Sequence, residues 1–226
     1  IISGCRKDCP IILLINEGNM DKQLLKLLNK KRKIAYDDPQ SISSEYDEYL
    51  AKNGVYHSFN EKVFFNSIRN KGYLCEFTLS MFFKATYDNE KEFMLNCLLH
   101  MGYDHNLLVE LVLDIFEKQK HNEYLWHYAD FLYSLKNYKY MDDYLRLIMD
   151  KEYDTNREML ILLVGESKQI IAVPYLKELS TDDVVLGHVL IALGNYYDDE
   201  IVSIMKKHTN HPIKWISDVA KQYLAT

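Results

Sequence analysis

The sequence contains few residues that break helices, with only 8 glycines and 4 prolines among 226 residues. Glycine and proline are the strongest local breakers of regular structure, so their scarcity indicates helices joined by short turns. Apolar residues make up 48% of the chain and charged residues 27%, proportions that are ordinary for a globular protein. The length therefore predicts one large or two small folded domains with a substantial core.

Long apolar runs, export patterns and paired cysteines are also missing. No apolar stretch reaches the length that crosses a membrane, so we expect no membrane partner. No basic region precedes an apolar core, as it would in a signal peptide. We expect reduced thiols and a cytoplasmic location, because no CxxC pair occurs among the four cysteines, Cys5, Cys9, Cys75 and Cys97.

Motifs that bind cofactors or carry catalysis are absent as well. The sequence has no P-loop and no GxGxxG, GxSxG or HExxH motif. Its 8 histidines form no tight cluster, and Cys5 and Cys9 would supply only two ligands, too few for a zinc site. We therefore expect no metal and no cofactor, and we favour a protein without enzymatic activity.

Charge is unevenly distributed along the chain. Residues 1–85 carry 13 basic and 10 acidic residues, a net charge of +3, whereas residues 86–226 carry 14 basic and 23 acidic residues, a net charge of −9. An acidic surface repels a phosphate backbone, so nucleic acid is an unfavoured partner. One dense basic run, at residues 30–33, is expected to be a solvated helix end.

A small residue recurs every 29 to 32 residues in the second half of the chain, at Gly102, Ser134, Gly165 and Gly194. An apolar segment precedes each of them, and an amphipathic segment with apolar residues at i, i+3, i+4 and i+7 follows after a short polar turn. A period near 30 residues that is built from two helices predicts an α-α superhelix, or solenoid. We expect the small residue to let the chain turn tightly where each first helix ends.

The residues that carry this repeat resemble a known family. One unit contains Gly165, Pro174 and Leu176 with "LKEL", and the next unit contains "DDVVLGHVLIALGNYYDDEIVSIM". These segments are similar to HEAT repeats, in the bacterial variety also described as phycobilisome-lyase-like HEAT repeats. The resemblance implies an all-α fold with about four HEAT-like repeats and a partial C-terminal repeat in residues 90–226.

Residues 1–89 are less regular and are expected to form a helical N-terminal cap, or a divergent repeat. Residues 20–33, 60–72 and 73–86 have helical patterns. Residues 35–49 are polar and contain a proline, so we predict a loop there.

HEAT-like proteins are mostly binding scaffolds, and the family resemblance implies that their second helices line a concave binding face. The outward positions of these helices change sign along the chain, from acidic at Glu110, Asp114, Asp142 and Asp143 to basic at Arg146, Lys177, Lys206 and Lys207. A surface graded from acid to base suits a protein or peptide. We therefore predict a non-enzymatic scaffold for a protein partner, of which an antitoxin-like or immunity role would be one instance.

The alternative is an enzyme, because a few HEAT-like proteins are alkylpurine DNA glycosylases, which hold the base with two tryptophans and an aspartate. Trp126, Asp130 and Trp215 resemble that set, and Trp126 and Asp130 share a helix face. Asp130, however, falls in an otherwise apolar column, and a buried carboxylate needs a partner. We favour a structural ion pair between Asp130 and Arg157 of the next repeat over catalysis.

Overall fold

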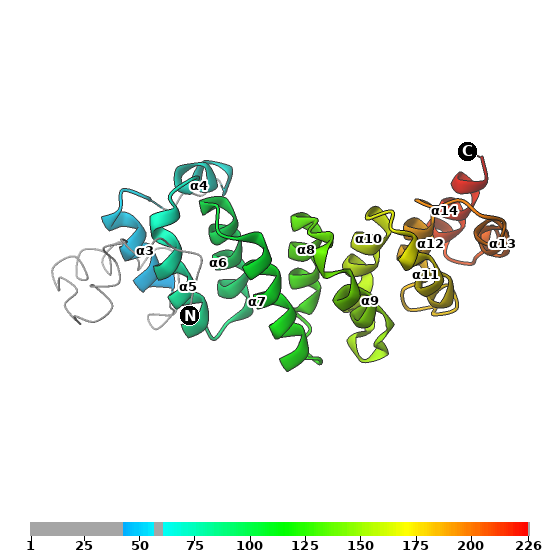
Figure 1. Ribbon diagram of the computed structural model, residues 1–226, viewed down its shortest axis with the longest axis horizontal. Coiled ribbons are helices and arrows are strands. Elements are labelled where there is room, and N and C mark those ends of the chain that lie inside the picture. Colours follow the sequence, from blue (N-terminus) through cyan, green and yellow to red (C-terminus); the bar gives the residue numbers. More distant parts are fainter. Residues whose placement is uncertain (1–42, 57–60, 226) are drawn as a thin grey trace. The chain divides into compact units, whose positions relative to one another are not determined.

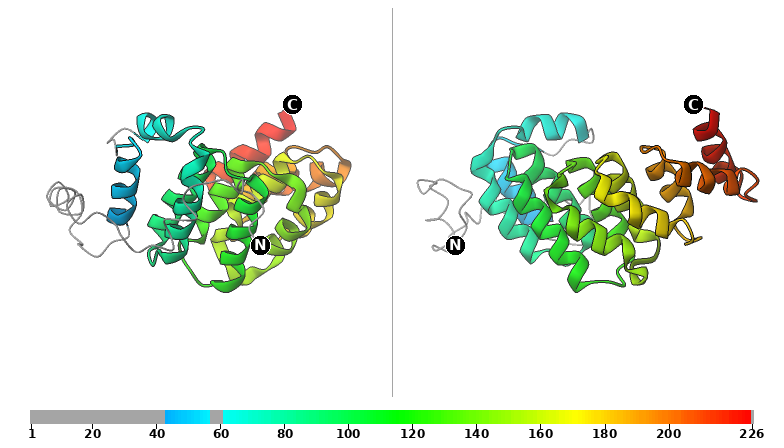
Figure 2. Two further views of the ribbon diagram at one scale, coloured as in Figure 1. Left: turned by 60° about the vertical axis from the view of Figure 1, so that its left-hand side comes forward. Right: turned by 45° about the vertical axis from the view of Figure 1, so that its right-hand side comes forward.

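A computed structural model describes residues 43–56 and 61–225 (Figure 1). Every regular element in these ranges is a helix, and no strand occurs in them, as two further views also show (Figure 2). The all-α prediction is therefore confirmed. Within the same ranges no helix is both long enough and apolar enough to cross a membrane. The helix predicted at residues 20–33 and the basic run at residues 30–33 lie outside the described residues.

The chain divides into two compact units, Ile1–Leu108 and Val109–Thr226. Helix α7 (His105–Lys118) runs across the division and contributes residues to both units. The boundary that we expected between residues 89 and 90 separates an N-terminal cap from repeats, whereas this division separates two compact units. The division therefore does not test the expected boundary, which stays a prediction.

The first unit contains four further described helices, α3 (Ser43–Lys52), α4 (Glu61–Ile68), α5 (Cys75–Lys84) and α6 (Asp88–Met101), and the short 3-10 turn η1 (Gly72–Leu74). Helices α4 and α5 confirm the two helical patterns, and both pack against α6. The loop predicted at residues 35–49 is wrong from Ser43 onward, where α3 begins. Tyr46 and Leu50 lie one helical turn apart on α3 and are both buried, which explains why this polar segment is helical.

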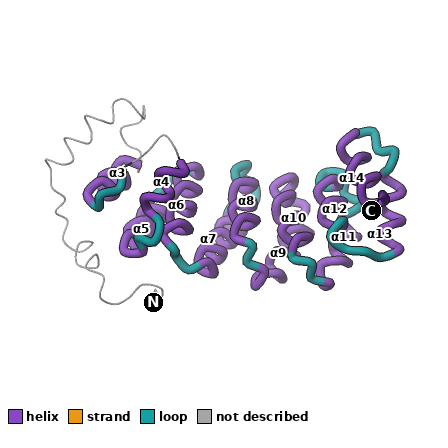
Figure 3. Tube along the Cα trace, turned by 90° about the horizontal axis from the view of Figure 1, so that it is seen from above, coloured by secondary structure: helices purple, strands orange, loops and turns teal. Residues whose placement is uncertain are grey.

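The second unit contains seven helices besides its part of α7: α8 (Leu125–Leu135), α9 (Met141–Met149), α10 (Glu158–Glu166), α11 (Val173–Leu179), α12 (Leu186–Leu193), α13 (Asp199–His208) and α14 (Lys214–Ala225). Helix α10 packs between α8 and α12, and α12 also packs against α14. Figure 3 shows α8, α10 and α12 in one row and α9 and α11 in a second row. The 3-10 turns η2 (Tyr138–Tyr140), η3 (Lys151–Arg157) and η4 (Ile170–Ala172) each precede an α-helix.

Helices α7, α9 and α13, and η4 together with α11, bury equivalent positions. The first apolar column is buried throughout, at Val109, Met141, Ala172 and Ile201. So is the column four residues later, at Leu113, Leu145, Leu176 and Met205. Tyr175 is an exception, because 38% of it is exposed although it falls in an apolar column. The 3.6-residue period thus predicts which side of these helices forms the core.

The recurring small residues serve different purposes, contrary to the single role that we expected. Gly102 does end α6 in the left-handed region, with φ of 83°. Gly165 instead lies inside α10, where an added Cβ would come within 2.5 Å of the Cα of Ala192 on α12. Ser134 precedes the actual left-handed cap at Lys136, and Gly194 has a right-handed conformation. Close packing of two helices therefore explains Gly165 better than a turn does.

Candidate functional site

Arg157 is buried, but its charged partner is Asp182 and not Asp130. Its Nη2 lies 3.0 Å from Oδ2 of Asp182, in the turn before α12. Nη1 donates to the carbonyl of Ile148 at 3.0 Å, and Nε donates to the carbonyl of Asp154 at 2.9 Å. Every nitrogen of the guanidinium is thus engaged, and the predicted Asp130–Arg157 pair is wrong. Equal spacing in the repeat placed Asp130 beside Arg157, whereas the path of the connecting turns brings Asp182 there.

Asp130 is exposed on α8, and so is Trp126 one turn earlier. The apolar column in which Asp130 falls therefore does not mark a buried position at this residue. Trp126 is 37% exposed, and Trp215 is 46% exposed on α14. An added Cβ on Gly187 would lie 1.6 Å from the Cη2 atom of Trp215, so the indole sits directly on the glycine of α12. The structure therefore leaves all three residues of the alternative hypothesis accessible.

The eight charged residues predicted to bind a partner lie on α7, α9, α11 and α13, and we call them the second-helix strip. Two of its four cations, Arg146 and Lys177, face carboxylates. Nη2 of Arg146 lies 2.6 Å from Glu117 and 3.4 Å from Asp143. Nζ of Lys177 lies 2.7 Å from both Asp198 and Glu200. The hydrogen bond to Asp198, and then the one to Glu200, raise the pKa of Lys177.

Other members of the strip also have local partners. Asp114 pairs with Lys118 at 2.7 Å, and Glu110 accepts a hydrogen bond from the Tyr140 hydroxyl at 2.8 Å. Asp142, Lys206 and Lys207 are exposed. A shallow hollow of about 440 Å³ lies beside the strip, lined by Val173, Pro174, Lys177, Glu178 and Glu200. Much of the charge expected to attract a partner is thus already neutralised within the fold.

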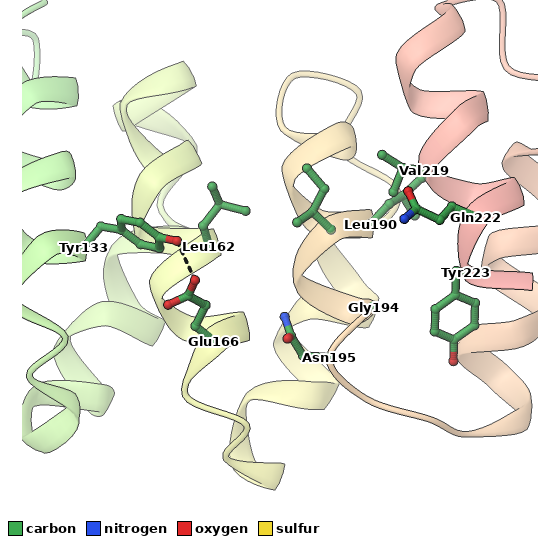
Figure 4. Close-up of a pocket in the computed structure, with 10 residues that line it drawn as sticks. Tyr133, Leu162, Glu166, Leu190, Gly194, Asn195, Val219, Gln222 and Tyr223 are labelled. Atoms are coloured by element: carbon green, nitrogen blue, oxygen red, sulfur yellow. Dashed lines mark hydrogen bonds between the residues drawn. The ribbon is translucent and has the colours of Figure 1, made fainter. Parts of the chain in front are cut away.

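A second hollow, of about 420 Å³, opens among the helices of the other row (Figure 4). Four helices line it, and we call it the first-helix pocket: Tyr133, Leu162, Glu166, Leu190, Ile191, Gly194, Asn195, Val219, Gln222 and Tyr223. Tyr133 and Glu166 stand on one side, and Asn195 and Gln222 stand on the other. The pocket combines aliphatic and aromatic walls with a carboxylate and two amides, which is the composition of a site that binds a ligand or peptide.

Glu166 is fixed in this pocket by two partners from α8 and its C-terminal cap. The Tyr133 hydroxyl donates to its Oε1 at 2.5 Å, and Nζ of Lys136 lies 2.7 Å from its Oε2. The hydrogen bond from Lys136, followed by the one from Tyr133, lowers the pKa of Glu166. The side chain therefore remains a carboxylate at neutral pH. It is held in one orientation, because both oxygens are engaged.

Sequence reasoning missed this pocket. The first helices have apolar residues almost all round, and we took that as the mark of helices packed between neighbours. Ile191 nevertheless is 41% exposed on α12, one of the most apolar helices. The signal for the pocket was the excess of apolar residues on these helices. A helix that is covered on two sides needs no apolar residue on its third side, so an apolar residue there indicates a site that another molecule covers.

Two further searches, for metal-ligating clusters and for known relatives, give no additional information on function. Within residues 43–56 and 61–225, no group of three or more His, Cys, Asp or Glu side chains could hold a metal ion. Comparison of the chain with protein-family models, curated proteins and solved structures found no match.

Proposed function

We propose that the protein is a non-enzymatic scaffold that binds a protein or peptide through a HEAT-like solenoid of helix pairs. The observation that carries the proposal is the first-helix pocket, an open hollow in which Ile191, Val219 and Tyr223 present apolar surface to solvent. Exposed apolar surface rimmed by polar groups is typical of sites that bind other proteins. An antitoxin-like or immunity function would be one instance of such binding.

The equivalent burial of successive second helices supports the solenoid part of the proposal. Two apolar columns are buried at every repeat, and α10 packs between the like helices α8 and α12. In a solenoid each repeat contacts its neighbours and leaves extended surfaces for binding. We also propose a cytoplasmic location, supported by the free, buried thiol of Cys97.

Selection from a random peptide display library tests the binding function directly. The full chain is immobilised, and enriched peptides are synthesised and titrated by fluorescence anisotropy. We expect saturable binding with roughly micromolar dissociation constants, as is common for short peptides in preformed sites. An unrelated acidic helical protein serves as the control for charge alone. Absence of any saturable peptide would contradict the proposed function.

A triple variant then tests the second-helix strip as the binding face. Arg146→Glu, Lys177→Glu and Lys206→Glu reverse one charge each on α9, α11 and α13. If the strip binds the selected peptides, the variant should lose affinity at low salt, mainly through a slower association rate, and the loss should shrink as salt rises. Unchanged affinity would exclude the strip and leave the binding function itself intact.

A second candidate is a DNA glycosylase for alkylated bases, favoured by the accessibility of Trp126, Asp130 and Trp215. The carboxylates nearby, including Glu166, oppose it because they repel a phosphate backbone. Release of an alkylated base from duplex DNA, abolished by Asp130→Asn without loss of fold, would establish the enzyme. We expect no release by the wild-type chain.

A further inference from the structure

The four helices that line the first-helix pocket carry further residues on the same faces. Each of its four helices carries an outward stripe that reaches the pocket at its C-terminal end, as residues three or four positions apart share a helix face. The stripes are Trp126, Asp130 and Tyr133 on α8; Glu158, Leu162 and Glu166 on α10; His188 and Ile191 on α12, with Asn195 just after it; and Trp215, Val219 and Gln222 on α14.

The stripes of α10, α12 and α14 also meet away from the pocket. Nδ1 of His188 lies 3.5 Å from Oε1 of Glu158, which joins α12 to α10. The His188 and Trp215 rings have centroids 5.8 Å apart in an edge arrangement, which joins α12 to α14. We call the pocket and the helix faces that continue from it, with Trp126, Asp130, Glu158, His188 and Trp215, the first-helix groove.

Apolar groups in the groove are held in place while a large part of their surface stays exposed. Trp215 rests on Gly187, where no side chain larger than hydrogen fits, yet the residue is 46% exposed. Ile191 is 41% exposed on the neighbouring helix. Aromatic side chains that are already fixed lose little conformational entropy on binding, and they frequently dominate the affinity of an interface.

The charged groups of the groove are mostly acidic. Asp130, Glu158 and Glu166 contribute three carboxylates, of which Glu166 pairs with Lys136 beside the groove. Among the described residues no ion pair engages Asp130, so its carboxylate faces solvent. The groove thus offers a negative potential beside apolar anchors, and a complementary partner carries positive charge beside apolar side chains.

We propose that the first-helix groove binds a polypeptide segment in which lysine or arginine residues alternate with leucine-like apolar residues. The inference rests on the proposed function, since the occupant is a polypeptide, and it adds the site and the chemical class. Apolar side chains of the segment pack on Trp215 and Ile191, and its cations face Asp130 and Glu158. Nucleic acid would place phosphates beside these same carboxylates.

The test uses two fluorescein-labelled peptides of equal length, one built from Leu-Leu-Lys repeats and one from Leu-Leu-Glu repeats. Both are titrated into the full chain, its Asp130→Lys variant and its Glu178→Lys variant. The two substitutions change the net charge equally, and both residues are exposed on helices. Asp130 belongs to the first-helix groove, whereas Glu178 lines the hollow beside the second-helix strip. Equal melting curves confirm that both variants are folded.

We expect the lysine peptide to bind the wild-type chain and the glutamate peptide to fail. Asp130→Lys should weaken the lysine peptide about tenfold at low salt, and Glu178→Lys should leave its affinity within about twofold. Ile191→Ser should weaken it with little dependence on salt.

Three results would overturn the inference. Equal binding of the two peptides would refute the charge complementarity. If Glu178→Lys weakened the affinity for the lysine peptide and Asp130→Lys did not, the binding site would lie at the second-helix strip, and the proposed function would still hold. Tighter binding of a labelled single-stranded oligonucleotide than of the lysine peptide, strengthened further in the Asp130→Lys variant but not in the Glu178→Lys variant, would assign the groove to nucleic acid. Failure of the proposed function would give a different result, because no peptide from the display library would then bind the chain saturably.

Discussion

On the second-helix strip, cations and carboxylates of neighbouring helices face one another, as Arg146 faces Glu117 and Lys177 faces Glu200. In the first-helix groove, exposed Asp130 stands one turn from a partly exposed tryptophan. The strip resembles an ordinary solvated surface, on which ion pairs contribute little. Among the described residues, no ion pair engages Asp130, so the fold does not use this carboxylate for its own stability. From residue types alone, the strip was the favoured binding surface. The ion pairs within the strip now make the groove the better candidate.

Arg157 connects the two rows of helices, and its loss should have the largest effect on both faces. Its guanidinium bonds the carbonyl of Ile148 on α9 and the carboxylate of Asp182 before α12. Arg157→Ala should destabilise the protein by about 3–5 kcal/mol, because it leaves the largely buried Asp182 carboxylate and the buried Ile148 carbonyl without their donor. Urea denaturation measures the change. A loss below about 1 kcal/mol would mean that water replaces the guanidinium.

Gly187→Ala should disturb the first-helix groove alone. The new Cβ would overlap the Trp215 indole, so the ring must move and the protein should lose about 1–3 kcal/mol. In a Trp126→Phe background, Trp215 is the only tryptophan, and its fluorescence reports the displacement. Gly72→Ala is the matched control, since its nearest neighbour would be 3.8 Å away. An unshifted emission spectrum in the Gly187 variant would contradict the described seat of the indole.

Acid should weaken the Arg157 contact through Asp182. Burial alone would raise the pKa of Asp182, but the hydrogen bond and charge of Arg157 outweigh it, and the folded-state pKa is lowered. The contribution to stability is therefore present above the ordinary aspartate pKa of about 4 and is lost as pH falls through the lower folded-state value. Wild-type stability should fall more steeply in this acidic range than that of Asp182→Asn. Parallel pH curves of the two proteins would refute the linkage.

Asp130→Asn should have the smallest effect on stability. The residue is exposed, so we expect a change of no more than about 0.5 kcal/mol, in contrast to the cost of removing a buried ion. Thermal and urea unfolding compare it with Asp182→Asn, in which the same chemical change removes a carboxylate that is 9% exposed. A loss above about 1 kcal/mol in the Asp130 variant would restore a structural role for this residue.

The sequence predicts burial better than it predicts partners. Leu113, Leu145 and Leu176 were assigned to the core by periodicity alone, and all three are buried. Periodicity succeeds there because the direction of a side chain on a helix depends only on its position in that helix. The path of the chain between helices is not contained in that period. Arg157 therefore meets Asp182, which lies in the turn before α12, rather than a residue at the matching repeat position.

The candidate site was predicted only in part. Trp126, Asp130 and Trp215 were identified, but as members of an unfavoured alternative, and their accessibility was not foreseen for Asp130. Glu166 and Ile191 were not identified at all, because a charged residue at a helix end and an isoleucine in an apolar helix are individually ordinary. Their importance arises from the four helices that bring them to one hollow.

The two tryptophans of the chain give the most direct test that a polypeptide occupies the first-helix groove. Both lie on its stripes, so a ¹H–¹⁵N spectrum contains two indole signals that report on this face. On titration with the Leu-Leu-Lys peptide, we predict that both signals shift and saturate at the same peptide concentration. Saturable binding that leaves both indole signals in place, while backbone signals of α9 and α11 move, would contradict the account.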